Sequence, residues 1–598
     1  MRKNGVFQTC LLVILAASIG YGQQSRPRQA GPRQARSDVA RSGETRSGET
    51  RSGQTGSDSP SDNGPADRGP ADRGPASAGS RPNIENLGNQ VNSEYNEINP
   101  LISPDGRTLY FARIRHPQNT LGPQGKNGDE PTSTQDIWYS QLDPATNTWG
   151  PAMHMGSPMN RELINGALSI TPDGNTILLK GAYNNGTYET RGFSLSKRTA
   201  NGWSAPQKLI IPGYESMSKG QFEYAFLSVD GKVLLLSFSE KRNSRADDLY
   251  VCFRQKDGTW SKPMSLGPEL NTKFTETTPF LAADGATLYF SSDRDGGLGK
   301  NDIYVTRRVD NTWQHWSKPQ NLGPSVNTDG YDAYYSVSAS GEYAYMTTFK
   351  ETLGLGDIVR IKLTDGSNDA PGRLGSGEDV ASNTGQTRPD PVVMISGKVV
   401  DQQTGRPVSA RIVYQTLPDG AEAGEATTDP VTGEYKIVLP YGQKYSMRAI
   451  APDFIAEGDN IDLTQTKGFQ EIKGKELKMV PIEVGRSVRL NNIFFAFGKA
   501  ELQPESFPEL DRMVTTLNEN PKMTVELGGH TDDVGSAESN AKLSQDRADA
   551  VREYLIGKGI EPDRMASKGY GETRPIARND SPEGQQQNRR VEFVILKK

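Results

Sequence analysis

The stretch Gly528-Gly529-His530-Thr531-Asp532-Asp533-Val534-Gly535-Ser536 lies near the C-terminus and introduces a segment with a clear helical pattern. In residues 537–557 the apolar residues fall on one stripe at about 100° per residue. They are Leu543, Ala550, Val551, Tyr554 and Leu555. We therefore predict an amphipathic helix over 537–557, preceded by a turn that contains Asp532.

Arg547 lies in this helix, fifteen positions after Asp532. Counted from Leu543 it is only about 40° around the helix, so a permanently charged group sits among apolar positions. A charge placed there needs a partner, and Asp532 is the natural candidate. The residues alone leave two interpretations open: a structural salt bridge between the two side chains, or a pair that binds a zwitterionic ligand.

Further short motifs surround this pair over residues 488–598. They are Ile493-Phe494-Phe495-Ala496-Phe497-Gly498-Lys499, Gly529-His530-Thr531-Asp532, Gly535-Ser536, Asn540, Leu543-Ser544, Arg547-Ala548, Lys568-Gly569-Tyr570-Gly571-Glu572 and Asn588-Arg589-Arg590-Val591-Glu592. With these motifs the segment resembles the OmpA-like C-terminal peptidoglycan-binding domains, a family that includes the peptidoglycan-associated lipoprotein and the stator protein of the flagellar motor.

The resemblance implies an α/β domain with a mixed sheet of the βαβαβ type. It also implies that Asp532 takes the ammonium, and Arg547 the carboxylate, of the diaminopimelate side chain in a peptidoglycan stem peptide. Such a pair selects a free zwitterionic end, because an arginine presents a planar fork to a carboxylate. Supporting roles are expected for Thr531, Asn540, Leu543 and Arg590. The strand motif of the family often has Asp or Asn where this chain has Ala496.

Composition sets broad limits on the rest of the chain. Its 598 residues, 34% hydrophobic content and mean hydropathy of -0.66 predict several domains joined by linkers. The net charge of -5 provides no basic field for nucleic acid, so no nucleic-acid partner is expected.

Residues 1–22 have the basic, apolar and small-residue parts of a secretory signal, which predicts export to the periplasm. Cys10 precedes most of the apolar run, so we expect no lipidation there. Cleavage would leave Cys252 as the only cysteine and exclude an intramolecular disulfide. We expect association with the outer membrane and peptidoglycan through partners.

Two low-complexity segments interrupt the chain. Residues 23–80 contain tandem repeats at 41–50 and 64–73 and almost no apolar residues, which predicts a disordered tether or spacer. Residues 365–391 are rich in Gly, Ser and Asp and are expected to be a linker.

Residues 81–364 contain an internal repeat. A turn of Asp or Ser followed by Gly recurs at Asp105, Asp173, Asp230, Asp284 and Ser340, and each turn joins two short apolar runs. A third run that begins with Asp and a Trp with a nearby Pro follow in most repeats. Four short strands per repeat predict a β-propeller, and the segment resembles the TolB-like class of WD-type propeller repeats.

The last repeat stops at Leu363 without a Trp-Pro strand, whereas Arg81 to Asn92 carries the tail that follows this strand in other repeats. We therefore predict that the N-terminal piece completes the last blade and closes a five-bladed ring. We expect this propeller to bind an outer-membrane or periplasmic protein.

Residues 392–480 alternate short strands with turns and resemble the carboxypeptidase regulatory-like domain, a small β-sandwich. The order of propeller, sandwich and OmpA-like domain also resembles the peptidoglycan-binding periplasmic component of the type IX secretion system. That component typically carries a helical repeat domain and a lipid anchor as well, and neither is visible in this sequence.

The sequence contains no clear catalytic constellation. The four histidines, His116, His154, His315 and His530, are not paired at metal-ligand spacing, and neither a nucleophile elbow nor a phosphate loop is present. We expect no catalytic residue, no metal and no cofactor, and a packing role for His530. The function predicted is a non-catalytic envelope anchor. The alternative is an enzyme whose propeller acts on a glycan or peptide while the C-terminal domain localises it to the wall.

Overall fold

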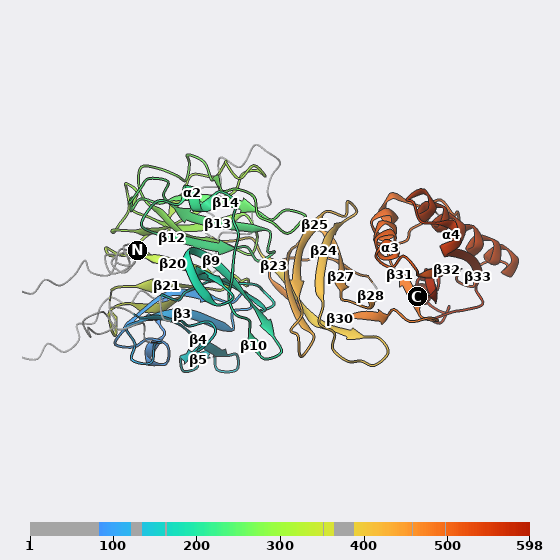
Figure 1. Cartoon of the computed structure of the whole chain (residues 1–598), viewed down its shortest axis with the longest axis horizontal. Helices are drawn as coiled ribbons and strands as arrows, with labels where there is room; N and C mark the ends of the chain where they lie inside the picture. Colours follow the sequence, from blue (N-terminus) through green and yellow to red (C-terminus); the bar gives the residue numbers. More distant parts are fainter. Residues whose placement is uncertain are drawn as a thin grey trace, which may run out of the picture. The chain divides into compact units, whose positions relative to one another are not determined.

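The computed structural model describes residues 83–120, 134–161, 164–350, 352–363, 388–456, 458–496 and 498–598. The predicted signal segment, the repeats of 23–80 and most of the 365–391 linker lie outside these ranges. The described part contains three regions, two of them built from β-strands and the third from strands and helices (Figure 1).

Five antiparallel sheets occupy residues 84–362. The first contains β2 (Asn96–Ile102), β3 (Thr108–Ile114), β4 (Gln135–Asp143), β5 (Thr148–Trp149) and β6 (Met153–His154). The second contains β7 (Ala167–Ile170), β8 (Thr176–Asn184), β9 (Thr187–Thr199), β10 (Gly202–Trp203) and β11 (Gln207–Lys208). The third contains β12 (Glu223–Leu227), β13 (Val233–Phe238), β14 (Asp248–Phe253) and β15 (Met264–Ser265).

The fourth sheet contains β16 (Glu276–Leu281), β17 (Thr287–Ser292), β18 (Asp302–Arg307) and β19 (Gln320–Asn321). The fifth contains β20 (Ala333–Val337), β21 (Tyr343–Thr348), β22 (Asp357–Lys362) and, from the other end of the segment, β1 (Ile84–Asn86). Two short helices, η1 (Gly88–Gln90) and α2 (Tyr214–Met217), lie in connections.

The Asp-Gly turns connect the first two strands of their sheets. In the first sheet, Asp105 Oδ1 accepts hydrogen bonds from Ser103 Oγ (2.6 Å) and from the Arg107 amide (3.1 Å). Gly106 follows with a φ of 70°, a left-handed conformation that glycine adopts without steric cost. The recurrence of this pair in the sequence therefore marks a recurring hairpin.

The segment before the first repeat adds a strand to the last sheet, as the sequence predicts. β1 pairs antiparallel with β22, with Ile84 opposite Ile361. The residues that follow are also buried, since Leu87 and Val91 pack in one cluster with Ile358. The two ends of the repeat segment are thus joined by backbone pairing and by apolar contacts.

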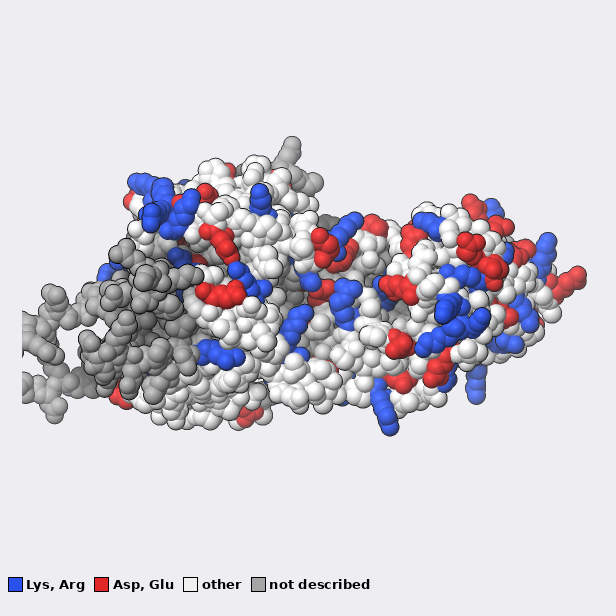
Figure 2. Space-filling view, viewed as in Figure 1, with Lys and Arg blue, Asp and Glu red and all other residues white. Residues whose placement is uncertain are grey.

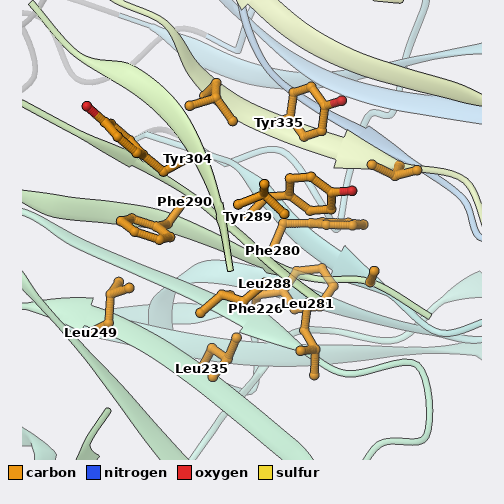
Figure 3. Packing of buried hydrophobic residues seen from close by; sticks show 14 of the residues in the cluster. Phe226, Leu235, Leu249, Phe280, Leu281, Leu288, Tyr289, Phe290, Tyr304 and Tyr335 are labelled. Carbon is orange, nitrogen blue, oxygen red and sulfur yellow. The ribbon is translucent and has the colours of Figure 1, made fainter. Parts of the chain in front are cut away.

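Apolar side chains fill the spaces between neighbouring sheets. One cluster runs through the third, fourth and fifth sheets, and Figure 3 shows Phe226, Phe280, Tyr289 and Tyr335 from these sheets packed together. The first strands also contact each other in chain order, β2 with β7, then β12, β16 and β20, and β20 contacts β2 again.

A second recurring feature of these sheets is an asparagine that binds the backbone of the third strand. Its side chain accepts a hydrogen bond from a backbone amide of the third strand and donates one to the carbonyl of the same residue, at distances between 2.7 and 3.0 Å. The pairs are Asn92 with Ile358, Asn160 with Ile137, Asn271 with Leu249, and Asn327 with Ile303. After the second sheet the connection contains α2 instead.

Residues 392–481 form two four-stranded sheets that share one apolar core. One sheet has the order β26 (Glu434–Pro440), β23 (Val392–Asp401), β30 (Gln470–Pro481) and β28 (Phe454–Ala456). The other has the order β25 (Glu422–Thr427), β24 (Arg411–Leu417), β27 (Lys444–Ile450) and β29 (Asp459–Asp462).

The C-terminal domain has a four-stranded mixed sheet, in the order β31 (Ser487–Leu490), β34 (Val591–Lys597), β32 (Thr524–His530) and β33 (Met565–Gly571). Only β32 and β33 are parallel. Its helices are η2 (Pro504–Ser506), α3 (Phe507–Glu519), α4 (Ala537–Gly557), η3 (Pro562–Arg564) and α5 (Pro582–Asn588). The helix predicted over 537–557 is confirmed with both of its ends.

The C-terminal part of the apolar stripe of α4 packs into the core of the domain. Val551 and Leu555 are completely buried and share a core with Leu510 of α3 and with Leu527 and Phe593 of the sheet. Arg547 therefore projects from a helix whose position is fixed by packing.

Residues 493–496, which belong to the family's strand motif, form no regular strand in this chain. Only Phe495 forms an isolated bridge, to Leu502. The Phe494 amide donates to Ser506 Oγ (2.7 Å), and the same hydroxyl donates back to the Phe494 carbonyl (3.0 Å). A serine side chain thus satisfies the backbone groups that a neighbouring strand would otherwise pair.

Candidate functional site

Asp532 lies in the turn between β32 and α4 and is 7% exposed. Its Oδ1 accepts a hydrogen bond from the Val534 amide (3.3 Å), and its Oδ2 accepts one from Arg589 Nη1 (2.5 Å). The Thr531 amide donates to the Gly571 carbonyl of β33 at 3.0 Å, so this turn is tied to the edge of the sheet.

Asn540 holds the backbone of the turn from the first part of α4. Its Nδ2 donates to the Asp532 carbonyl (3.3 Å) and to Glu572 Oε2 (2.7 Å). Ser536 caps the start of the helix, because its hydroxyl accepts a hydrogen bond from the Ser539 amide (3.2 Å). Asn540 therefore supports the site by fixing the position of Asp532.

Two other predicted supporting residues have a less direct role. Thr531 is buried, and its hydroxyl has no hydrogen-bond partner among the described residues. Leu543 lies half-buried on α4, one turn before Arg547. Neither side chain is seen to contact the Asp532 carboxylate.

Arg547 is held at one end of its guanidinium and open at the other. Its Nε donates to the Lys499 carbonyl (3.1 Å), and the guanidinium carbon lies 5.0 Å from the centre of the Phe495 ring. The two terminal nitrogens have no hydrogen-bond partner within the described residues. They can therefore present the planar fork to a carboxylate.

The charges around Arg547 identify its electrostatic neighbours. Burial lowers the pKa of the Arg547 guanidinium, and the positive charge of Arg589 acts in the same direction, whereas the Asp532 carboxylate opposes both. Arg547 therefore interacts electrostatically with both Asp532 and Arg589, and the three charges lie in one electrostatic field. Asp532 and Arg547 nevertheless form no direct ion pair with each other.

The interpretation of Asp532 and Arg547 as a structural salt bridge is wrong. The ion pair of Asp532 is formed with Arg589, at the junction of α5 and β34. Sequence reasoning missed Arg589 because the pair Arg589-Arg590 offers two equivalent side chains. Which of them reaches the turn depends on where α5 ends and β34 begins.

Arg590, predicted to support the ligand site, has a different role. It is buried, and its guanidinium donates to Glu592 Oε2 (3.1 Å), to the Asn588 carbonyl (3.4 Å) and to the Arg574 carbonyl (3.1 Å). These three contacts compensate the buried positive charge of Arg590 within the domain, so its guanidinium has a structural role.

His530 packs inside the domain, as the sequence predicts. It is 1% exposed, stacks on Tyr570 at a ring distance of 5.2 Å and has its Nε2 3.1 Å from Glu592 Oε1. Burial raises the pKa of Glu592, but the hydrogen bond from His530 and the charge of Arg590 outweigh it and lower this pKa to about 2. The contacts are those of a structural network.

An open hollow of about 730 Å³ begins beside Asp532, since the next residue, Asp533, lines it together with residues 575–580. Asn588, which is completely buried, holds this loop. Its Oδ1 accepts from the amides of Ile576 (2.8 Å) and Ala577 (3.0 Å), and its Nδ2 donates to the Ala577 carbonyl (2.8 Å) and to Asn579 Oδ1 (2.7 Å). The motif Asn588-Arg589-Arg590 marked Asn588 in the sequence, but the sequence alone could not predict which loop residues Asn588 binds.

Both charge signs are present on the surface of the C-terminal domain. Figure 2 shows acidic and basic side chains interspersed over the viewed face of the C-terminal domain, so neither sign covers it alone. A surface of this kind suits a ligand that carries opposite charges better than a polyanion.

Comparison with known proteins identifies this domain. Residues 494–589 match the model of the OmpA family. The chain carries an OmpA family domain at its C-terminus. The matched residues include the Asp532 turn, Arg547 and Arg589.

Two curated proteins illustrate the similarity of the OmpA family domain. Outer membrane protein A of Bordetella avium is 38% identical over 120 residues, which are 20% of this chain and 62% of that protein. The peptidoglycan-binding protein ArfA of Mycobacterium tuberculosis is 41% identical over 102 residues, or 17% and 31% of the two chains. The chain thus spans less than two thirds of the length of both relatives.

Among solved structures, the peptidoglycan-associated lipoprotein of Burkholderia pseudomallei is 29% identical. The match covers 18% of this chain and 89% of that chain, with a TM-score of 0.17.

Two further observations concern the described residues as a whole. No helix in the described ranges is long and apolar enough to cross a membrane. Within the same ranges, no group of three or more His, Cys, Asp or Glu side chains is arranged to hold a metal ion. Cys252 is a free thiol in the repeat region, and burial raises its pKa to about 12.

Proposed function

We propose that the protein is a non-covalent peptidoglycan anchor of the cell envelope, which binds the diaminopimelate side chain of a stem peptide with Asp532 and Arg547. One observation carries this proposal. The Arg547 guanidinium is fixed through Nε while its terminal nitrogens have no partner among the described residues, and Asp532 is the acid in its field. The ammonium of the ligand would bind Asp532, and its carboxylate would bind Arg547.

The relatives support the choice of ligand. The name of ArfA describes a peptidoglycan-binding protein, and that of the Burkholderia protein describes a peptidoglycan-associated one. The hollow beside Asp533 gives the remainder of a stem peptide room next to the charged pair. A periplasmic location, in contact with the outer membrane and the wall, follows from this ligand.

The proposal is tested by co-sedimentation of the mature chain with purified sacculi of the diaminopimelate type. Asp532→Asn and Arg547→Gln should each weaken binding by about 2–5 kcal/mol, which is enough to abolish sedimentation of a micromolar binder. Asp546→Asn is the matched control, because Asp546 precedes Arg547 on α4 and is exposed. The helical circular-dichroism signal checks that each variant is folded.

Peptidoglycan of the lysine type supplies a second control. Lysine has the ammonium but lacks the carboxylate for Arg547, so the wild type should not sediment with this wall. Equal binding of both walls, or wild-type binding by both charge variants, would show that the site is assigned wrongly.

We also propose that the five sheets of residues 84–362 form a five-bladed propeller that presents a surface to an envelope protein. Support comes from the pairing of β1 with β22 and from the contact between β2 and β20. The order of domains would then be that of the peptidoglycan-binding component of the type IX secretion system. Purified chain that releases soluble fragments from peptidoglycan or polysaccharide would instead favour the enzyme alternative.

A further inference from the structure

Arg589 gives the candidate site a second cation. Its Nη1 donates to Asp532 Oδ2 at 2.5 Å, and its Nη2 donates to Gln586 Oε1. The side chain of Asp532 is 11% exposed, whereas that of Arg589 is 38% exposed. The acid is thus held in place, while its partner lies at the surface and has room to move.

The three charges of the site do not cancel. Asp532 contributes one negative charge, and Arg547 and Arg589 contribute one positive charge each; these are the groups that act on Arg547. A ligand with one ammonium and one carboxylate would satisfy Asp532 and Arg547. Arg589 would then lose its present partner to the ammonium and be left as an uncompensated cation.

Diaminopimelate can supply the missing anion. When it is the last residue of the stem it carries one free ammonium and two free carboxylates, one at each end of a flexible methylene chain. When another residue follows it, one of those carboxylates becomes a neutral amide and the terminal negative charge moves to the added residue. In the first form all three charges of the ligand lie on one residue, as the three charges of the site lie in one field.

We infer that Arg589 binds the second carboxylate, so that the domain prefers a stem peptide that ends in diaminopimelate over one that continues beyond it. The inference rests on the proposed function. On binding, the ammonium replaces the Arg589 guanidinium at Asp532, and Arg589 turns to the terminal carboxylate. No covalent bond changes, and three opposite-charge contacts replace one.

The test measures the affinity of the mature full-length chain for two soluble muropeptides by calorimetry. One carries a tripeptide stem ending in diaminopimelate, and the other a tetrapeptide stem with a further D-alanine. The wild type should bind the tripeptide about tenfold more tightly, as expected for one additional, partly exposed charge pair. The preference should weaken as salt is added, because exposed charges are screened.

Arg589→Gln should bind the two muropeptides equally. Lys522→Gln is the matched control, because Lys522 is an exposed cation just before β32, at the end opposite the Asp532 turn, and it should keep the tenfold preference. A wild type that binds both stems equally would overturn the inference, as would an Arg589→Gln variant that keeps the preference. Tighter binding of both stems by Arg589→Gln would mean that Arg589 only blocks Asp532, which also overturns it.

Two further variants separate this inference from the proposed function. If Asp532→Asn and Arg547→Gln bind both muropeptides as the wild type does, the proposed function fails. If both variants lose both ligands while the wild type shows no preference, only the role of Arg589 fails.

Discussion

Replacing Asn588 with alanine should release the loop that lines the hollow beside Asp532. Its completely buried side chain accepts hydrogen bonds from the amides of Ile576 and Ala577. A net contribution of about 1 kcal/mol per hydrogen bond gives about 2 kcal/mol for the two amides. Local opening should then become about thirtyfold more frequent, since 1.4 kcal/mol corresponds to a factor of ten.

Hydrogen–deuterium exchange of the mature chain, read by mass spectrometry, measures this effect directly. Peptides that contain Ile576 and Ala577 should exchange about thirtyfold faster in Asn588→Ala, while peptides from β32 should be unchanged. Asn579→Ala is the matched control, because it removes one contact of Asn588 and leaves both amide contacts in place. A change of less than about threefold would refute the reasoning and show that other contacts hold the loop.

Three further predictions concern stability. Asn327→Ala should destabilise the repeat region by about 2–3 kcal/mol, because the amide and carbonyl of Ile303 lose their hydrogen-bond partner. Unfolding followed by tryptophan fluorescence measures this change. The control Asn201→Ala, at an exposed turn, should have no effect. Deleting residues 82–92 should lower the melting temperature of the same region sharply, and an unchanged melt would contradict the role of β1. The lowered pKa of Glu592 stabilises the folded C-terminal domain at pH values above 4.5, the ordinary pKa of a glutamate. About 3 kcal/mol of this stabilisation is lost as the pH falls from 4.5 towards 2. In Glu592→Gln the denaturant concentration at the unfolding midpoint should therefore depend less on pH over that range.

The distribution of chromophores makes these measurements specific. All six tryptophans lie between residues 138 and 316, within the repeat region. In the described part of the chain, every helix longer than four residues belongs to the C-terminal domain. Tryptophan emission therefore reports on the five sheets, and the helical circular-dichroism signal reports on the OmpA family domain.

Periodic features of the fold could be predicted from the sequence. The apolar stripe predicted the helix α4, because burial against a sheet imposes helical spacing on side chains. The Asp-Gly turns located the hairpins, because a left-handed turn position restricts the residue type locally. The tail before the first repeat identified the strand that joins the last sheet, since it carries the same local pattern.

Features set by tertiary contacts could not be predicted. Phe494 belongs to the strand motif of the family, yet the Ser506 hydroxyl binds the Phe494 amide and carbonyl, which a neighbouring strand would otherwise pair. Arg589 and Arg590 are adjacent and chemically identical, and only the junction of α5 and β34 sends one to Asp532 and the other to Glu592. The sequence therefore predicted Asp532 and Arg547 as a candidate pair, but it could not assign the partners of Arg589 and Arg590.

The three charged residues of the site are placed by parts of one rigid core. Asp532 follows β32, Arg547 projects from α4, and Arg589 precedes β34. The two strands and the helix meet in the same apolar cluster, which includes Leu527, Val551 and Phe593. The positions of their backbones are thus fixed before a ligand arrives, and binding requires little ordering beyond the movement of surface side chains. The same arrangement explains why Asn540 and Asn588 matter although neither need touch the ligand: Asn540 fixes the backbone of Asp532, and Asn588 fixes the loop that lines the hollow.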